Sequence, residues 1–169
     1  MAALAARIDR LNAAAGRLAD WLLFAVLALQ LSVVLLRYVF GVGSLALQEA
    51  VTYAHASAFL LAAGWVLAVE GHVRVDVLYG HLSPRGRAWV DLCGALGLLI
   101  PFMATILWFA VPYVASSAAV LERSRDPGGL PAVFALKAMI VVFAVLFALQ
   151  GLALALRAAV TLLPPRERT

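Results

Sequence analysis

Ionisable side chains that could form a metal site or a proton relay are concentrated between residues 70 and 82. Glu70, His72, Arg74, Asp76 and His81 alternate there with apolar residues, as expected of a segment half immersed at a membrane surface. The two histidines and Asp76 are candidate metal ligands, but neither histidine has the companion four residues away that is typical of a helical zinc site. We therefore expect a loop folded over helix ends, where Glu70, His72 and Asp76 contact a partner protein and no metal is bound.

A second polar set, Gln48, Thr52 and His55, occupies positions i, i+4 and i+7 of the apolar segment 47–69. On a helix these side chains form a narrow stripe, continued by Ala62, of the kind that lets membrane helices approach and hydrogen-bond. His55 could also ligate haem, but bis-imidazole ligation needs a second histidine at similar depth, and the other two histidines follow the segment. We expect Thr52 and His55 to contact another helix and expect no cofactor. A haem-binding electron-transfer membrane protein is the alternative.

Arg37 and Glu49 flank a short turn and can meet at the same depth, where unpaired charges are costly. We predict that they form an ion pair that staples a helical hairpin. The alternatives are a contact with a partner protein and a transport site. Lys137, near the start of the last apolar segment, is expected to extend its stem toward the outer surface.

The composition identifies the elements that must carry these side chains. Of the 169 residues, 65% are hydrophobic and 13% are charged, whereas soluble domains have about 45–50% apolar and about 25% charged residues. A single core of this size cannot hide the excess, which must face lipid or an embedded partner. Because about 20 apolar residues cross the hydrocarbon core, the sequence predicts four spans, at about residues 21–40, 47–69, 84–114 and 131–156.

The expected fold is therefore an all-α integral membrane four-helix bundle that forms one domain over residues 1–169. Pro101 and Pro112 predict a bend in the third span. Cys93 is the only cysteine, so a disulfide within the chain is excluded. Residues 157–169 are expected to form a cytoplasmic tail.

Residues 1–20 have the pattern of an amphipathic helix. One face carries Leu4, Ile8, Leu11, Ala15 and Leu18, and the opposite face carries Arg7, Asp9, Arg10 and Arg17. This pattern predicts an N-terminal helix that lies in the cytoplasmic interface, and the alternative is a plain extension of the first span. The first span also loosely resembles a signal peptide, but its apolar run is long and is interrupted by Arg37, so we expect it to be retained.

The basic residues predict the orientation of the spans, because short loops rich in Lys and Arg remain in the cytoplasm. Nine of the 13 fall on one side: Arg7, Arg10, Arg17, Arg74, Arg85, Arg87, Arg157, Arg166 and Arg168. Both termini are thus predicted to be cytoplasmic. No basic block indicates nucleic-acid binding. The sequence also has no phosphate loop, nucleophile elbow or paired deep carboxylates, so an enzyme is not expected.

Several motifs occur in a fixed order along the chain. They are Arg37-Tyr38-Val39-Phe40 closing the first span, Gln48-Glu49-Ala50 opening the second, Gly71-His72-Val73-Arg74-Val75-Asp76 after it, and Pro131, Lys137 and Gln150 in the last. Together they resemble the small permease subunit, DctQ type, of a TRAP (tripartite ATP-independent periplasmic) transporter. The resemblance covers the chain from about Trp21 to Arg157. Such subunits often open the second helix with two acids, whereas here Gln48 precedes Glu49.

The resemblance implies a role in a complex of the bacterial inner membrane. A large permease subunit would carry the substrate and sodium sites and move like an elevator, and a periplasmic substrate-binding protein would deliver an organic-acid-like solute. The small subunit would be a fixed scaffold, held by the large subunit and by membrane lipids. Separately from the resemblance, the charges of the outer loop, Ser116 to Gly129, suggest the hypothesis that it helps to dock the binding protein through charge complementarity.

Overall fold

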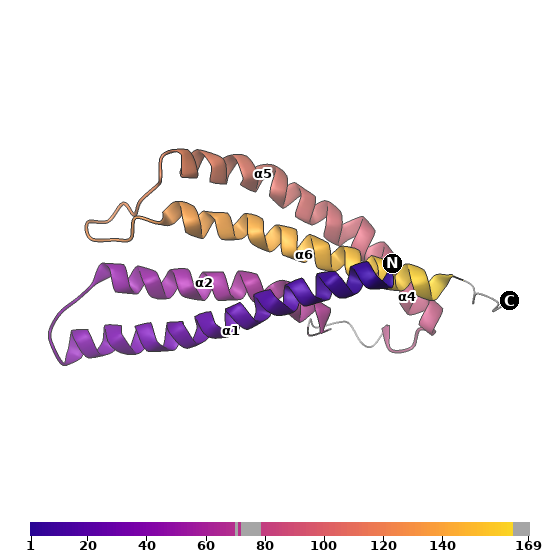
Figure 1. The fold of residues 1–169 in the computed structure, drawn as a ribbon, viewed down its shortest axis with the longest axis horizontal. Helices are drawn as coiled ribbons and strands as arrows, with labels where there is room; N and C mark the ends of the chain where they lie inside the picture. The colour runs from indigo at the N-terminus through magenta and orange to yellow at the C-terminus, as the bar shows by residue number, and fades with distance from the viewer. Residues whose placement is uncertain (70, 72–78, 164–169) are drawn as a thin grey trace.

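The computed structural model describes residues 1–69, 71 and 79–163, most of which lie in long helices (Figure 1). The helices are α1 (Ala2–Tyr38), α2 (Leu45–Ala68), α4 (Pro84–Gly94), the π-helix η1 (Ala95–Leu99), α5 (Ile100–Ala119) and α6 (Val133–Leu162). Because α4, η1 and α5 run on without a break, the described part of the chain has four helices long and apolar enough to cross a membrane. The predicted all-α membrane architecture is confirmed.

Helix α1 is a single element of 37 residues, about 55 Å long at 1.5 Å per residue. No break separates residues 1–20 from the first span. Residues 1–20 are therefore a plain extension of that span, as in the second of the two interpretations of the sequence. The side chains buried along its first half are Ala5, Ile8, Asn12, Gly16 and Ala19. Leu4, Leu11 and Leu18 are exposed. The small-residue face thus packs within the chain, and the leucines remain available to lipid or to a partner.

Helices α1 and α2 form an antiparallel hairpin. The Ser44 side chain caps α2 by accepting a hydrogen bond from the Leu47 N–H, one of the amides that a helix N-terminus leaves unpaired. At the other end of the hairpin, Gly16 lies against Trp65. A Cβ on Gly16 would lie 2.8 Å from Trp65 Cγ, so the missing side chain is what lets the indole pack across α1.

The third span changes helix type immediately before Pro101. The Ile100 N–H bonds to the Ala95 carbonyl, five residues back. Proline has no N–H and its ring crowds the preceding turn, and a wide π turn is one way in which a helix accommodates such a defect. Pro112 lies further along, inside α5. Both prolines are thus accommodated within continuous helix.

Helix α6 is the centre of the molecule, because it packs against α1, α2, α4, η1 and α5. Figure 1 shows α1, α2, α6 and α5 side by side as a flat row, with the start of α1 crossing toward α6. The accessible surface is 11,179 Å², against about 8,000 Å² for a folded soluble monomer of this mass. The flat row therefore leaves broad helix faces for lipid or for another protein to cover.

Candidate partner interface

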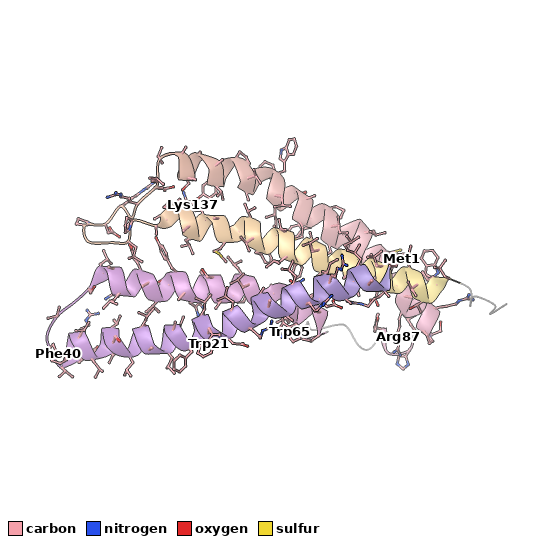
Figure 2. All side chains as sticks on the ribbon, viewed as in Figure 1. Met1, Trp21, Phe40, Trp65, Arg87 and Lys137 are labelled. Carbon is pink, nitrogen blue, oxygen red and sulfur yellow. The ribbon has the colours of Figure 1, made fainter. Side chains whose placement is uncertain are left out.

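The candidate side chains lie at the two ends of the row and along one face of α2. Lys137 lies at the same end as Phe40, and Arg87 lies at the opposite end, with Met1 (Figure 2). We refer to these as the Lys137 end and the Arg87 end.

The stripe of Gln48, Thr52 and His55 lies on the exposed face of α2. Thr52 Oγ1 donates a hydrogen bond to the Gln48 carbonyl over 3.2 Å, and neither α1 nor α6 covers the three side chains. Phe59, 74% exposed, extends this face by one turn, whereas Ala62 packs against the core of the hairpin. Polar side chains within a span are costly in lipid and favourable against a neighbouring helix. The stripe thus has the properties of a helix-docking face.

Glu49 does not form the ion pair with Arg37 that the sequence suggested. Its carboxylate accepts hydrogen bonds from the Ser124 hydroxyl, at 2.5 Å, and from the Leu130 N–H, at 2.6 Å. Within the described residues no ion pair joins Arg37 to Glu49, and the Arg37 side chain is exposed at the end of α1. The ion-pair prediction was wrong because the loop after α5 folds back over the start of α2 and supplies donors that local spacing could not reveal.

The glycines at the end of this loop make the contact with Glu49 possible. Gly128 has a φ of +83°, in the left-handed region that favours glycine. A Cβ on Gly129 would lie 2.4 Å from Ser124 Oγ and 2.8 Å from Glu49 Oε1. Any side chain at Gly129 would therefore displace the hydroxyl and the carboxylate that join the loop to α2.

Lys137 and Glu122 form a second link at the same end. Lys137 Nζ contacts Glu122 Oε2 at 2.5 Å and lies 4.3 Å from the centre of the Tyr113 ring. Ser117, which is buried, donates to the same carboxylate oxygen at 2.6 Å. The hydrogen bond from Lys137, and then that from Ser117, holds the pKa of Glu122 below its ordinary value of 4.5. Lys137 thus holds the loop between α5 and α6 through its ion pair with Glu122.

A buried polar network toward the Arg87 end was not predicted from the sequence. Asn12 and Gln150 are both 0% exposed, and Asn12 Nδ2 donates to Gln150 Oε1 over 2.8 Å. Gln150 Nε2 donates to Asp9 Oδ1 at 2.9 Å, and Arg157 Nη1 donates to both oxygens of Asp9, at 3.0 and 2.8 Å. The four side chains form one chain of hydrogen bonds that fixes α1 against α6.

The signal that could have revealed this network is the position of Asn12 in the sequence. It follows Ile8 by four residues and Ala5 by seven, so it lies on the small-residue face of α1. Its Nδ2 also donates to the carbonyls of Ile8 and Leu146, each at 3.4 Å. Asn12 Oδ1 is buried without a hydrogen-bond partner in the described structure and lies directly against Gly64, where a Cβ would be 2.1 Å away.

The segment after α2 is described only in part. Glu70, His72 and Asp76 lie outside the described residues. The Tyr79 hydroxyl donates to Asp91 Oδ2 at 2.8 Å, and Arg87 donates to the carbonyls of Gly80 and Leu82 at 2.9 and 3.1 Å. These bonds fix the residues before Ser83, which caps α4 by accepting from the Gly86 N–H.

No group of three or more His, Cys, Asp or Glu side chains is placed to hold a metal ion within residues 1–69, 71 and 79–163. His55 and His81 are both exposed, the first midway along α2 and the second before α4. The set of His72, Asp76 and His81 falls partly outside the described residues.

The family model described as "Tripartite ATP-independent periplasmic transporters, DctQ component" matches residues 23–161. The match begins inside α1 and ends at the last turn of α6, so it covers the second part of α1 and nearly all of the other three long helices. No curated protein and no solved structure shows significant similarity to the chain.

Proposed function

This chain belongs to the DctQ family of tripartite ATP-independent periplasmic transporter components, and from that premise we propose that it acts as a scaffold for a large permease subunit. It is a multi-pass membrane protein and the small membrane subunit of such a transporter. The proposed transport is sodium-driven import of an organic-acid-like solute. A periplasmic binding protein delivers the solute, and the large subunit carries it.

One observation supports the scaffold role most directly, namely the exposed polar stripe on α2. Gln48, Thr52 and His55 lie within a membrane span, yet none of the helices that the structure describes covers them. The Thr52 hydroxyl is satisfied within α2 by the Gln48 carbonyl, but lipid offers the Gln48 amide and the His55 ring no hydrogen-bond partner, whereas a helix of the large subunit can. A carrier that moves like an elevator needs a static part to slide against, and a flat row of four spans enlarges that part.

The other candidate contacts divide between the two ends. Arg37 is exposed and free to meet the large subunit, whereas Glu49 and Lys137 act indirectly by holding the loop between α5 and α6. Glu70, His72 and Asp76 are proposed as contacts at the opposite side of the membrane.

The loop itself exposes Arg123, Arg125 and Asp126. We place this Lys137 end in the periplasm, because the more numerous basic residues lie at the opposite side of the spans. The inner membrane is then the location, both termini are cytoplasmic and the whole chain is one membrane domain. The exposed loop charges are available to guide a binding protein by charge complementarity.

Two threonines provide a matched test of the docking face. Thr52 on α2 and Thr105 on α5 are both exposed, and each donates to the carbonyl four residues earlier on its own helix. Thr52→Trp should reduce the amount of large subunit that co-purifies with the chain by about tenfold or more, equivalent to a loss of about 1.4 kcal/mol. Thr105→Trp should leave co-purification and solute uptake unchanged. A loss caused by Thr105→Trp alone would place the interface on α5, and stable transport by the isolated chain would refute the scaffold role.

A further inference from the structure

Two hollows adjoin one another at the Arg87 end, and Arg157 lines both of them. One, of about 310 Å³, lies between the start of α1 and the end of α6. The other, of about 300 Å³, lies between α4 and the end of α6. A charged side chain therefore stands between two openings that flank the last turns of the same helix.

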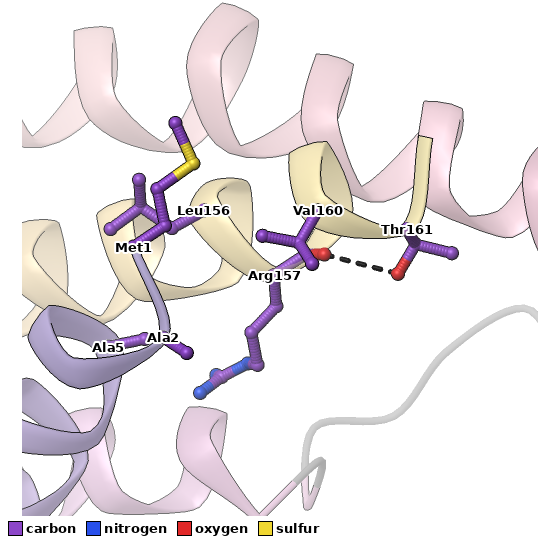
Figure 3. A pocket seen from close by; sticks show the side chains of 7 residues that line it. All are labelled: Met1, Ala2, Ala5, Leu156, Arg157, Val160 and Thr161. Carbon is purple, nitrogen blue, oxygen red and sulfur yellow. Dashed lines mark hydrogen bonds between the residues drawn. The ribbon is translucent and has the colours of Figure 1, made fainter. Parts of the chain in front are cut away.

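The hollow between α1 and α6 is walled mainly by apolar side chains. Figure 3 shows Met1, Leu156 and Val160 along it, with Arg157 beside them. Met1 and Val160 are 68% and 47% exposed, and Leu163 just beyond is also exposed. Apolar side chains gathered around an opening of this size suit a hydrocarbon chain.

The second hollow is more polar, because Arg87 lines it together with Arg157. Arg157 uses only Nη1 for its bonds to Asp9, and Arg87 uses Nε and Nη2 for backbone carbonyls. Arg157 Nε and Nη2 and Arg87 Nη1 have no acceptor in the described part of the chain. Two guanidinium groups with unused donors thus border one opening, the arrangement that binds phosphate oxygens well.

The neighbouring charges favour an anion there. Asp91, which accepts from Tyr79, also lines the hollow, and Asp9 is bound by Gln150 and Arg157, so these two carboxylates offset the charges of Arg87 and Arg157. Arg85, at the start of α4, and Arg10, on α1, add exposed positive charge at the same end of the molecule.

The depth of these groups matches a lipid headgroup. No charged residue lies between Lys137 and Arg157 on α6. Their separation of 20 residues corresponds to about 30 Å of helix, the thickness of the hydrocarbon core. Trp89, on α4 beside Arg87, is 57% exposed, as aromatic residues at a membrane interface commonly are.

We propose that these two hollows together bind one anionic phospholipid. The headgroup phosphate lies between Arg157 and Arg87, and an acyl chain follows the apolar wall of Met1, Leu156 and Val160. The lipid joins α1, α4 and α6 at their shared end. This assignment is independent of the scaffold role, because it concerns the opposite end of the chain from the outer loop and a different helix face from the α2 stripe.

The test is native mass spectrometry of the full-length chain in detergent, alone or in its complex, with phosphatidylglycerol or phosphatidylethanolamine of identical acyl chains. The wild type should retain phosphatidylglycerol preferentially. Arg157→Gln and Arg87→Gln should each lower that preference about fivefold, as expected for one basic residue near a membrane surface. Arg125→Gln, which removes an exposed arginine at the Lys137 end, is the matched control and should change nothing.

Two further variants keep the test decisive if Arg157→Gln disturbs folding. Arg157→Lys should retain most of the preference, and Val160→Glu, which leaves the bond between Asp9 and Arg157 intact, should abolish it. Equal retention of both lipids by the wild type would overturn the proposal. So would an equal loss in Arg125→Gln, or displacement of the lipid by excess inorganic phosphate, which would indicate a site for free anions.

Discussion

Replacing Gly64 with alanine should weaken the packing of α2 against α1. The added Cβ would lie 2.1 Å from Asn12 Oδ1 and 2.9 Å from Asn12 Cγ. Asn12 is fully buried between α1 and α6 and cannot turn toward solvent. The methyl group must therefore displace the amide that donates to Gln150, or push α2 away from α1.

The magnitude follows from two opposing effects. Overpacking of a well-filled interior typically costs about 1–3 kcal/mol, whereas replacing glycine by alanine in a helix contributes up to about 1 kcal/mol in favour of the helix. Gly64→Ala should therefore lower the free energy of unfolding by about 1–2 kcal/mol. Gly94→Ala is the matched control, because a Cβ at Gly94 would meet nothing within 4 Å. It should leave stability unchanged or raise it slightly.

A double-mutant cycle with Asn12→Ala identifies the cause. Asn12→Ala alone leaves Gln150 Oε1 buried without its donor, which costs about 1–3 kcal/mol. In that background the atoms that Gly64→Ala would strike are gone, so the second substitution should cost little. The assay is reversible unfolding in mixed micelles of the wild type, both single variants and the double variant. A coupling energy of about 1–2 kcal/mol is expected, and additive effects of the two substitutions would refute the argument.

Three other predictions concern the Lys137 end and the alternative function. Glu49→Ala should speed hydrogen exchange of the Leu130 amide, because Glu49 accepts a hydrogen bond from that amide. Arg37→Ala should not change the exchange rate. Equal effects of the two substitutions would support the ion pair between Arg37 and Glu49 after all. The pKa of Glu122 is lower in the folded protein than its ordinary value of 4.5. The stabilisation from its carboxylate is therefore fully present above pH 4.5 and is lost as the pH falls through the pKa of the folded state. Carboxyl NMR should thus place its midpoint below 4.5, Lys137→Met should raise it, and a wild-type midpoint at or above 4.5 would contradict the assignment. Purified protein should show no visible haem band, and a strong band that His55→Ala removes would support the electron-transfer alternative instead.

The helices could be predicted from the sequence because the bilayer imposes a simple requirement. A run of about 20 apolar residues has few stable arrangements in lipid other than a spanning helix. The predicted second span, 47–69, and the observed α2, Leu45–Ala68, differ by only a residue or two at each end. The largest difference lies at the start of the chain, because the charges of residues 7–20 do not interrupt α1. They project from a helix whose small-residue face remains packed.

The contacts between distant residues could not be predicted in the same way. Glu49 and Arg37 are close in sequence, and this proximity suggested their pairing. The true donors, Ser124 and Leu130, are more than 70 positions away and arrive through a loop whose path depends on two glycines. A single sequence gives the periodicity of one helix, but not the rotation and stagger of one helix against another.

The central claim is that the polar face of α2 docks on a large permease subunit. The most direct test places a photo-crosslinking amino acid at His55, on that face, and in parallel at the exposed Thr105 of α5 in the intact transporter complex. If α2 docks in this way, position 55 should crosslink to the large subunit, and position 105 should not or should do so far less. Crosslinks from position 105 alone, or only to lipid from position 55, would contradict it.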